Sequence, residues 1–185
     1  MAMGIRPSLA LWMTFGTLTA LCLFALPFAG GSGAAHAGDK SVAAQRKGSG
    51  LPIPRFASLR SDEVNVRTGP GPRYPVDWVF KRKAMPVEIV AEYENWRKIR
   101  DWQGASGWVH QSLLTGKRSF IIAAKAANLH KTPASSAEVV AKLEPEVMGE
   151  IRSCTGDWCR VKVSGVSGWI ERTNMWGVYK SEPIN

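Results

Sequence analysis

Three short landmarks occur twice in this chain, in the same order, and this repetition limits the possible folds more than any other feature of the sequence. The second copies lie 63, 62 and 61 residues after the first. The three pairs are VNVRTGP at 64–70 with ANLHKTP at 127–133, NWRKI at 95–99 with DWCRV at 157–161, and SGWV at 106–109 with SGWI at 167–170. A repeat of about 60 residues has the size of a small domain, so the sequence predicts two tandem modules.

Each repeat contains short apolar runs separated by turn residues. In the first copy these runs lie at 64–66, 78–80, 87–90, 96–100 and 107–109, and in the second at 128–129, 139–141, 147–152, 159–163 and 168–170. Short strands at such close spacing are typical of small all-β barrels. We therefore expect an all-β chain with two tandem small β-barrels, module 1 at residues 58–118 and module 2 at residues 119–185.

The first 37 residues have the layout of a secretory signal peptide. Arg6 precedes an uncharged apolar stretch, Leu9–Phe28, and small residues then lead to Ala35-His36-Ala37, an A-x-A cleavage pattern. We expect release before Gly38 and export to the periplasm or cell envelope of a bacterium. The alternative is an uncleaved membrane anchor, since 20 apolar residues are long enough to span a bilayer.

A basic linker is expected at residues 38–57, where Gly, Ser, Ala and Lys show no periodicity. Residues 38–60 carry five basic residues against Asp39, a net charge of +4, whereas the chain without Arg6 has +8. Half of the excess charge thus lies in and beside a flexible leader. This placement favours contact with anionic lipid or an anionic wall polymer over a shaped nucleic-acid groove, and no nucleic-acid partner is expected.

Two cysteines remain after the expected signal peptide, Cys154 and Cys159. The residues between them, Thr-Gly-Asp-Trp, predict a four-residue hairpin loop that would place the cysteines opposite each other on paired strands. Opposed residues are close enough for a disulfide bond, and an oxidising compartment favours it. The alternative is a pair of free thiols. A metal site is not expected, because no other Cys or suitably spaced His completes a ligand set.

Strand alternation predicts which side chains near each Trp-containing landmark face outward. Alternate residues share one face of a strand, and the apolar positions of 159–163 are expected to face the core. The outward-facing candidates for ligand binding are Trp96, Lys98 and Arg100 in module 1, and Trp158 and Arg160 in module 2. The alternative is that each Trp packs beneath Lys and Arg side chains as a cation–π pair.

At these residues the chain resembles the bacterial SH3-like (SH3b) domain family. Asn-Val-Arg-x-Gly-Pro at 65–70 matches the opening motif of the family, and residues 128–133 are a weaker copy. A Trp before a strand and a closing Gly-Trp-Val or Gly-Trp-Ile occur in both repeats. The resemblance covers about residues 58–118 and 121–179 and implies SH3-like barrels. It also implies non-catalytic modules, which in this family are often fused to wall hydrolases and in several cases resemble binders of peptidoglycan peptides.

The loop after the first strand of module 1 is a candidate ligand site, because loops on a rigid scaffold commonly carry function. Arg67 is expected near this loop, where its guanidinium could hold a carboxylate in a bidentate contact. Tyr74 and Trp78 would add an aromatic wall. The alternative is that Arg67 pairs with Asp62 or Glu63 and stiffens the loop. Module 2 has His130 and Thr132 at the positions of Arg67 and Gly69.

The sequence does not favour an enzyme or a cofactor. No nucleophile constellation, paired-carboxylate motif or phosphate-binding Gly-rich loop occurs, and two modules of about 60 residues leave no room for a catalytic domain. We therefore expect an exported, non-catalytic protein that binds peptidoglycan or its stem peptides. The alternative is an envelope scaffold that docks a protein partner through Trp and Arg surfaces, and that an uncleaved N-terminus would tether to the membrane.

Overall fold

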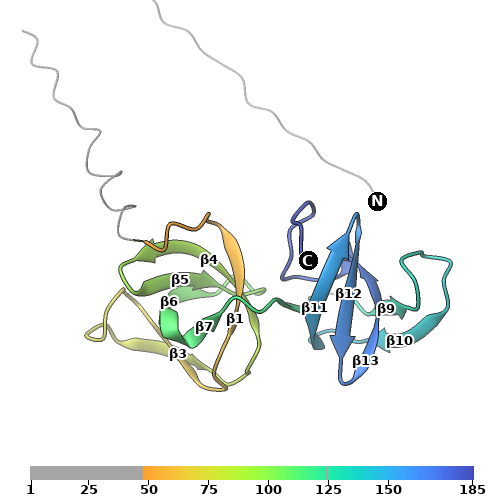
Figure 1. Ribbon diagram of the computed structural model, residues 1–185. Helices are drawn as coiled ribbons and strands as arrows, with labels where there is room; N and C mark the ends of the chain where they lie inside the picture. Colours follow the sequence, from red (N-terminus) through yellow and green to blue (C-terminus); the bar gives the residue numbers. More distant parts are fainter. Residues whose placement is uncertain (1–47, 124) are drawn as a thin grey trace, which may run out of the picture. The chain divides into compact units, whose positions relative to one another are not determined.

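The computed structural model describes residues 48–123 and 125–185 (Figure 1). These residues belong to one compact unit. The expected signal peptide, its cleavage site and the first half of the expected basic linker lie outside the described residues and stay predictions. In the described part of the chain, no helix is long and apolar enough to cross a membrane.

Strands of the first repeat form an antiparallel sheet with the order β3-β2-β6-β5-β4-β1-β7. The strands are β1 (Arg55–Leu59), β2 (Val64–Arg67), β3 (Val76–Phe80), β4 (Pro86–Tyr93), β5 (Trp96–Arg100), β6 (Ser106–His110) and β7 (Leu114–Thr115). Strands β4 and β5 form one hairpin, and β5 and β6 form the next. Strand β1 pairs with both β4 and β7.

Strands of the second repeat form another antiparallel sheet with the order β10-β9-β13-β12-β11-β8. The strands are β8 (Ser119–Ile121), β9 (Ala127–His130), β10 (Val139–Leu143), β11 (Met148–Thr155), β12 (Trp158–Val163) and β13 (Val166–Glu171). The order matches the first sheet position by position, except that a single bridge between Ile121 and Trp176 takes the place of β7. The repeated landmarks thus occupy equivalent strands.

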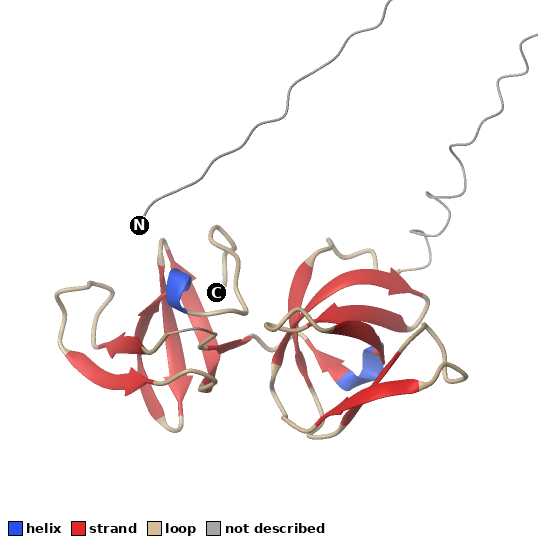
Figure 2. Ribbon diagram, turned by 180° about the vertical axis from the view of Figure 1, so that it is seen from behind, coloured by secondary structure: helices blue, strands red, loops and turns tan. Residues whose placement is uncertain are grey.

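The all-β prediction is confirmed (Figure 2). Helical structure among the described residues is restricted to two short 3₁₀ helices, η1 (Gln111–Leu113) and η2 (Arg172–Asn174). Each follows the last long strand of its sheet. In each case the strand ends at a residue with extended backbone, His110 or Glu171, and this residue is the N-cap of a single helical turn.

Each sheet encloses its own apolar cluster. In β12 the alternation is clear, since Cys159, Val161 and Val163 are buried while the residues between them are exposed. In β5 the equivalent pattern holds for Ile99, but Arg97 is also buried, at 4% exposure. Alternation alone does not reveal this buried arginine, because a charged residue on the core side requires partners that lie elsewhere in the sequence.

The predicted disulfide bond is confirmed at the tip of the β11–β12 hairpin. Cys154 and Cys159 are opposed in the strand register, with their Cα atoms 4.0 Å apart. The hairpin loop is shorter than the four residues expected, because Thr155 pairs with Trp158 and leaves two residues in the turn. Gly156 adopts φ +55° there, a left-handed conformation that tight two-residue turns require.

The segment after η2 contacts residues of the first sheet. The Tyr179 hydroxyl donates a hydrogen bond of 2.7 Å to Oε1 of Glu88. The ring of Phe56 meets the rings of Trp176 and Tyr179 at centroid distances of 4.8 and 4.6 Å. Burial and the hydrogen bond to Glu88 raise the pKa of Tyr179, so its hydroxyl stays protonated as the donor.

Candidate functional site

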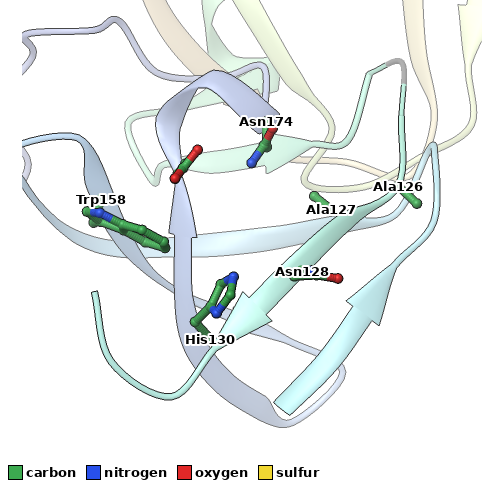
Figure 3. A pocket seen from close by; sticks show the side chains of 7 residues that line it. Ala126, Ala127, Asn128, His130, Trp158 and Asn174 are labelled. Carbon is green, nitrogen blue, oxygen red and sulfur yellow. The ribbon is translucent and has the colours of Figure 1, made fainter. Parts of the chain in front are cut away.

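A pocket of about 190 Å³ opens on the second sheet (Figure 3). Its lining combines small residues at the start of β9 with polar and aromatic side chains from four elements. The lining residues are Ala126, Ala127, Asn128, His130, Trp158, Glu171 and Asn174. The four labelled polar and aromatic side chains surround the same opening in Figure 3.

Strand alternation and register bring these side chains together. Asn128 and His130 are two residues apart in β9 and therefore project from the same face, while Leu129 between them is fully buried. Trp158 begins β12 and is paired directly with Glu171 at the end of β13. Asn174 ends η2, so the 3₁₀ turn after β13 carries its amide to the pocket.

His130 is fixed from two sides. Its Nδ1 lies 3.0 Å from the carbonyl oxygen of Ala137, and since a carbonyl only accepts, this nitrogen carries the hydrogen. Its ring meets the Trp158 ring edge to face, with centroids 5.5 Å apart. The side chain is 8% exposed. His130 therefore ties the loop after β9 to the strand that carries Trp158.

Arg67 makes the equivalent contact in the first module. Its Nη1 donates a hydrogen bond of 2.7 Å to the carbonyl oxygen of Tyr74, the residue equivalent to Ala137. The ion pairs of the described residues do not include Arg67 with Asp62 or Glu63, so the expected stiffening acts through a backbone carbonyl instead. Two different side chains thus hold the same loop in the two modules. A ligand role for Arg67 stays a prediction.

The other residues predicted from sequence to bind a ligand are not gathered in one site. Trp158 lines the pocket, and Trp96, its counterpart, packs edge to face on His110 with centroids 5.5 Å apart. Trp78 is half-buried against Phe80, whereas Tyr74 is 47% exposed. Arg100 donates to the Glu88 carboxylate, Lys98 is half-buried, and Arg160 is exposed. Trp96 and Trp158 both pack on histidines, and the cation–π pair found among the described residues joins Arg118 to Phe56 instead.

Four polar lining residues were missed by the sequence-based prediction, among them His130, which was noted only as the residue at the position of Arg67. The sequence could have identified Asn128, because the repeat keeps Asn at positions 65 and 128 while the neighbouring residues differ. Glu171 and Asn174 follow the last landmark and carry no such signal. Their position depends on the β12–β13 register and on the turn after β13, which a single sequence does not specify.

The pocket suits a peptide better than a metal ion. Two side-chain amides and one carboxylate offer donors and acceptors that match backbone amide groups, and the Trp158 ring provides an apolar face. No group of three or more His, Cys, Asp or Glu residues in the described part of the chain has the geometry to hold a metal. The size of the pocket fits one small residue of a ligand at a time.

Comparison with known proteins gives one curated relative and several solved structures. The chain is 24% identical over 125 residues to the "Putative N-acetylmuramoyl-L-alanine amidase YrvJ" of Bacillus subtilis (strain 168), a match that covers 62% of this chain and 24% of that protein. The chain thus spans about a quarter of the length of that relative.

The solved structures that match include NlpC2 and NlpC1 from Trichomonas vaginalis, at 12% and 13% identity and a TM-score of 0.33 for each. These matches cover 71% and 70% of this chain, and 51% and 48% of the two proteins. A model of the bacterial SH3 domain matches residues 60–116 and 123–177, which together make up more than half of the chain. The chain therefore belongs to the bacterial SH3 domain family, with two tandem copies.

Proposed function

We propose that this chain is an exported, non-catalytic binding protein that engages the stem peptides of peptidoglycan. In this proposal each sheet curls into an SH3-like barrel, with module boundaries at 58–118 and 119–185. The observation that carries the proposal is the polar pocket at Asn128, Trp158, Glu171 and Asn174, which offers amide donors and acceptors beside an aromatic face. Membership of the bacterial SH3 domain family supports it, as does the likeness to a protein named for a cell-wall amidase.

The chemistry of a stem peptide matches this pocket. Its backbone amides would hydrogen-bond to the Asn128 and Asn174 side chains, and its small side chains would fit against the Trp158 ring. The Glu171 carboxylate would accept from an amide N–H or an ammonium group. His130, whose Nδ1 is engaged by the loop carbonyl, holds the Trp158 ring in place for this contact.

The test is co-sedimentation of residues 38–185 with purified sacculi at about 0.3 M salt, where attraction between exposed charges is largely screened. We expect the protein to pellet, and the variants Asn128→Ala and Glu171→Gln to pellet much less. Lys162→Ala, an exposed change on the same strand as Trp158, is the matched control and should pellet like the unaltered protein. Arg67→Ala and Arg160→Ala test the residues predicted from sequence.

Failure to pellet would contradict the proposal and favour a protein partner in the envelope. Pelleting that is equally strong in all variants would contradict the assignment of the site to this pocket. Circular dichroism of each variant controls for folding, since Asn128 is exposed and Glu171 is half-exposed, and neither belongs to an apolar core cluster.

A further inference from the structure

A second and larger hollow lies away from the pocket of the second sheet. It has a volume of about 650 Å³ and is bounded by the end of β1, the turn before β4, the β7–β8 connection and the start of β11. It shares no residue with the pocket proposed to bind stem peptides. We refer to it as the junction groove, because residues of both repeats line it.

The junction groove is strongly basic. Arg60, Lys83, Lys117 and Arg118 line it, against the single carboxylate of Glu150. Glu150 is itself paired with Arg152 at 2.9 Å. Four cations around one hollow create a positive potential that attracts anionic groups.

The four cations differ in how far they are already engaged. The Arg118 guanidinium binds the Glu182 carboxylate and the Gly177 carbonyl, so Arg118 has little capacity left for a ligand. Arg60 donates Nε and Nη2 to the Leu114 carbonyl, which leaves its Nη1 donors for a ligand.

Lys83 and Lys117 are exposed and form no ion pair within the described residues. They are therefore the groups best able to bind an anion directly.

Hydrogen bonds to the backbone fix the two segments that carry Lys83 and Lys117, the turn before β4 and the β7–β8 connection. The residue after Lys83, Ala84, donates its N–H to the Leu59 carbonyl at 2.9 Å, which ties the turn to β1. The Lys117 carbonyl accepts a 2.7 Å hydrogen bond from the buried hydroxyl of Ser58. Two cations on a fixed backbone lose less freedom on binding than lysines in mobile loops would.

Apolar atoms complete the lining. Ala84 and Met148 contribute them, and Met148 is half-buried, whereas Leu59 belongs to the buried core at 1% exposure. A bare phosphate polymer would leave this surface uncovered, whereas a peptide with aliphatic and carboxylate side chains would cover it and pair with the lysines.

We propose that the junction groove binds a short acidic peptide segment, whose carboxylates pair with Lys83 and Lys117. The occupant is defined by its chemistry, an extended chain of small apolar and acidic residues. This binding is independent of the pocket of the second sheet.

The test is fluorescence anisotropy of the full chain with a labelled peptide of alternating alanine and glutamate, at about 0.15 M salt. The Lys83→Gln/Lys117→Gln variant should bind this peptide at least about tenfold more weakly, as expected when two direct charge-assisted contacts are removed. The matched control is Lys81→Gln/Lys162→Gln, which removes the same charge from exposed positions outside the groove. This control should change the affinity by less than about twofold, because Lys81 and Lys162 make no direct contact with the peptide in the proposed site.

Three outcomes would overturn the proposal. The first is no binding of the peptide, and the second is an equal loss of affinity in the groove variant and the control. The third is that inorganic polyphosphate competes for the same lysines and binds more tightly than the peptide, which would assign the groove to phosphate instead. Weaker binding of the uncharged alanine–glutamine peptide supports the role of the carboxylates. Sacculus pelleting is read out separately, so either proposal can fail alone.

Discussion

The β4–β5 hairpin of the first sheet and the β11–β12 hairpin of the second sheet are equivalent, yet they are held together by different chemistry. In the register of the second hairpin Cys154 lies opposite Cys159, and the two form a disulfide bond. In the first hairpin the same positions are occupied by Glu92 and Arg97, whose carboxylate and guanidinium lie 3.1 Å apart. One module therefore closes this hairpin with a covalent bond and the other with a buried ion pair.

The ion pair belongs to a larger network. Arg97 also donates to the Glu94 and Trp96 carbonyls and to the Gln111 side chain, at 2.6 to 2.9 Å. Glu92 accepts from Arg55 at 2.5 Å as well. Because both side chains of the pair are less than a tenth exposed, neither is solvated well enough to tolerate loss of its partner. The disulfide of the second hairpin, by contrast, is a covalent bond and does not depend on a network of further polar contacts.

The largest expected effect is therefore in the first module. Arg97→Ala removes the ion pair and three further hydrogen bonds, and we expect a loss of about 3 kcal/mol in the free energy of unfolding. Urea denaturation followed by circular dichroism measures it. Lys98→Ala, the next residue on the same strand, is the control and should cost no more than about 0.5 kcal/mol. Equal losses of unfolding free energy in the two variants would mean that the ion pair does not hold this hairpin together.

A smaller effect is expected from reducing Cys154–Cys159. The loop that the bond closes spans a sequence separation of five, and chain-entropy estimates for so short a loop give about 2 kcal/mol. Urea denaturation with and without a reductant measures the difference, and the first module should keep its stability. A thiol assay on unfolded, unreduced residues 38–185 is the control, because Cys22 before this range would add a thiol of its own. Two reactive thiols there would contradict the bond itself.

Replacing the ion pair of the first hairpin with a disulfide bond should change the free energy of unfolding less than the loss of either the ion pair or the native disulfide. The variant Glu92→Cys/Arg97→Cys places two cysteines at the register positions that carry the disulfide in the second hairpin. We expect a bond to form and the net change in unfolding free energy to be about 1 kcal/mol or less, because the new cross-link offsets the lost ion pair. Intact mass and thiol counting report the bond. Persistent free thiols would show that the two hairpins differ in geometry as well as chemistry.

The sequence predicts these hairpins unequally well. The cysteine pair can be recognised because only two cysteines follow the apolar N-terminal segment. The strands follow from the repeated apolar runs, and the outward position of Trp158 follows from strand alternation. Arg97 gives no such signal, because its burial depends on Glu92 across the strand and on Gln111 from η1. Glu171 and Asn174 were missed for the same reason. Their role in the pocket follows from register and turn geometry, which repeat spacing does not encode.

Low pH should weaken the ion pair of the first hairpin but not the disulfide of the second, and this is the smallest of the expected effects on stability. Burial alone raises the pKa of Glu92, but hydrogen bonds from Arg55 and Ser49 and the charge of Arg55 outweigh it, so the pKa lies below the ordinary value of 4.5. A carboxyl whose pKa is lowered by folding contributes stability above its unfolded pKa and loses it as the pH falls through the folded pKa. The stability supplied by Glu92 should therefore decline below about pH 4.5, whereas the disulfide does not titrate.

This decline is measured as the difference in unfolding free energy between the unaltered chain and Glu92→Gln, at pH 7 and at steps down to about pH 3. The difference should shrink as the pH falls. Comparing variants is necessary because the pKa of Glu182 is also lowered, by Arg118 against the opposing effect of burial, and acid acts there too. Glu138→Gln is the matched control, since Glu138 pairs with Lys131 at 3.0 Å but is 69% exposed. A pH-independent difference for Glu92→Gln would mean that its carboxylate charge does not stabilise the first hairpin, leaving Arg97 held by its carbonyl and Gln111 contacts alone.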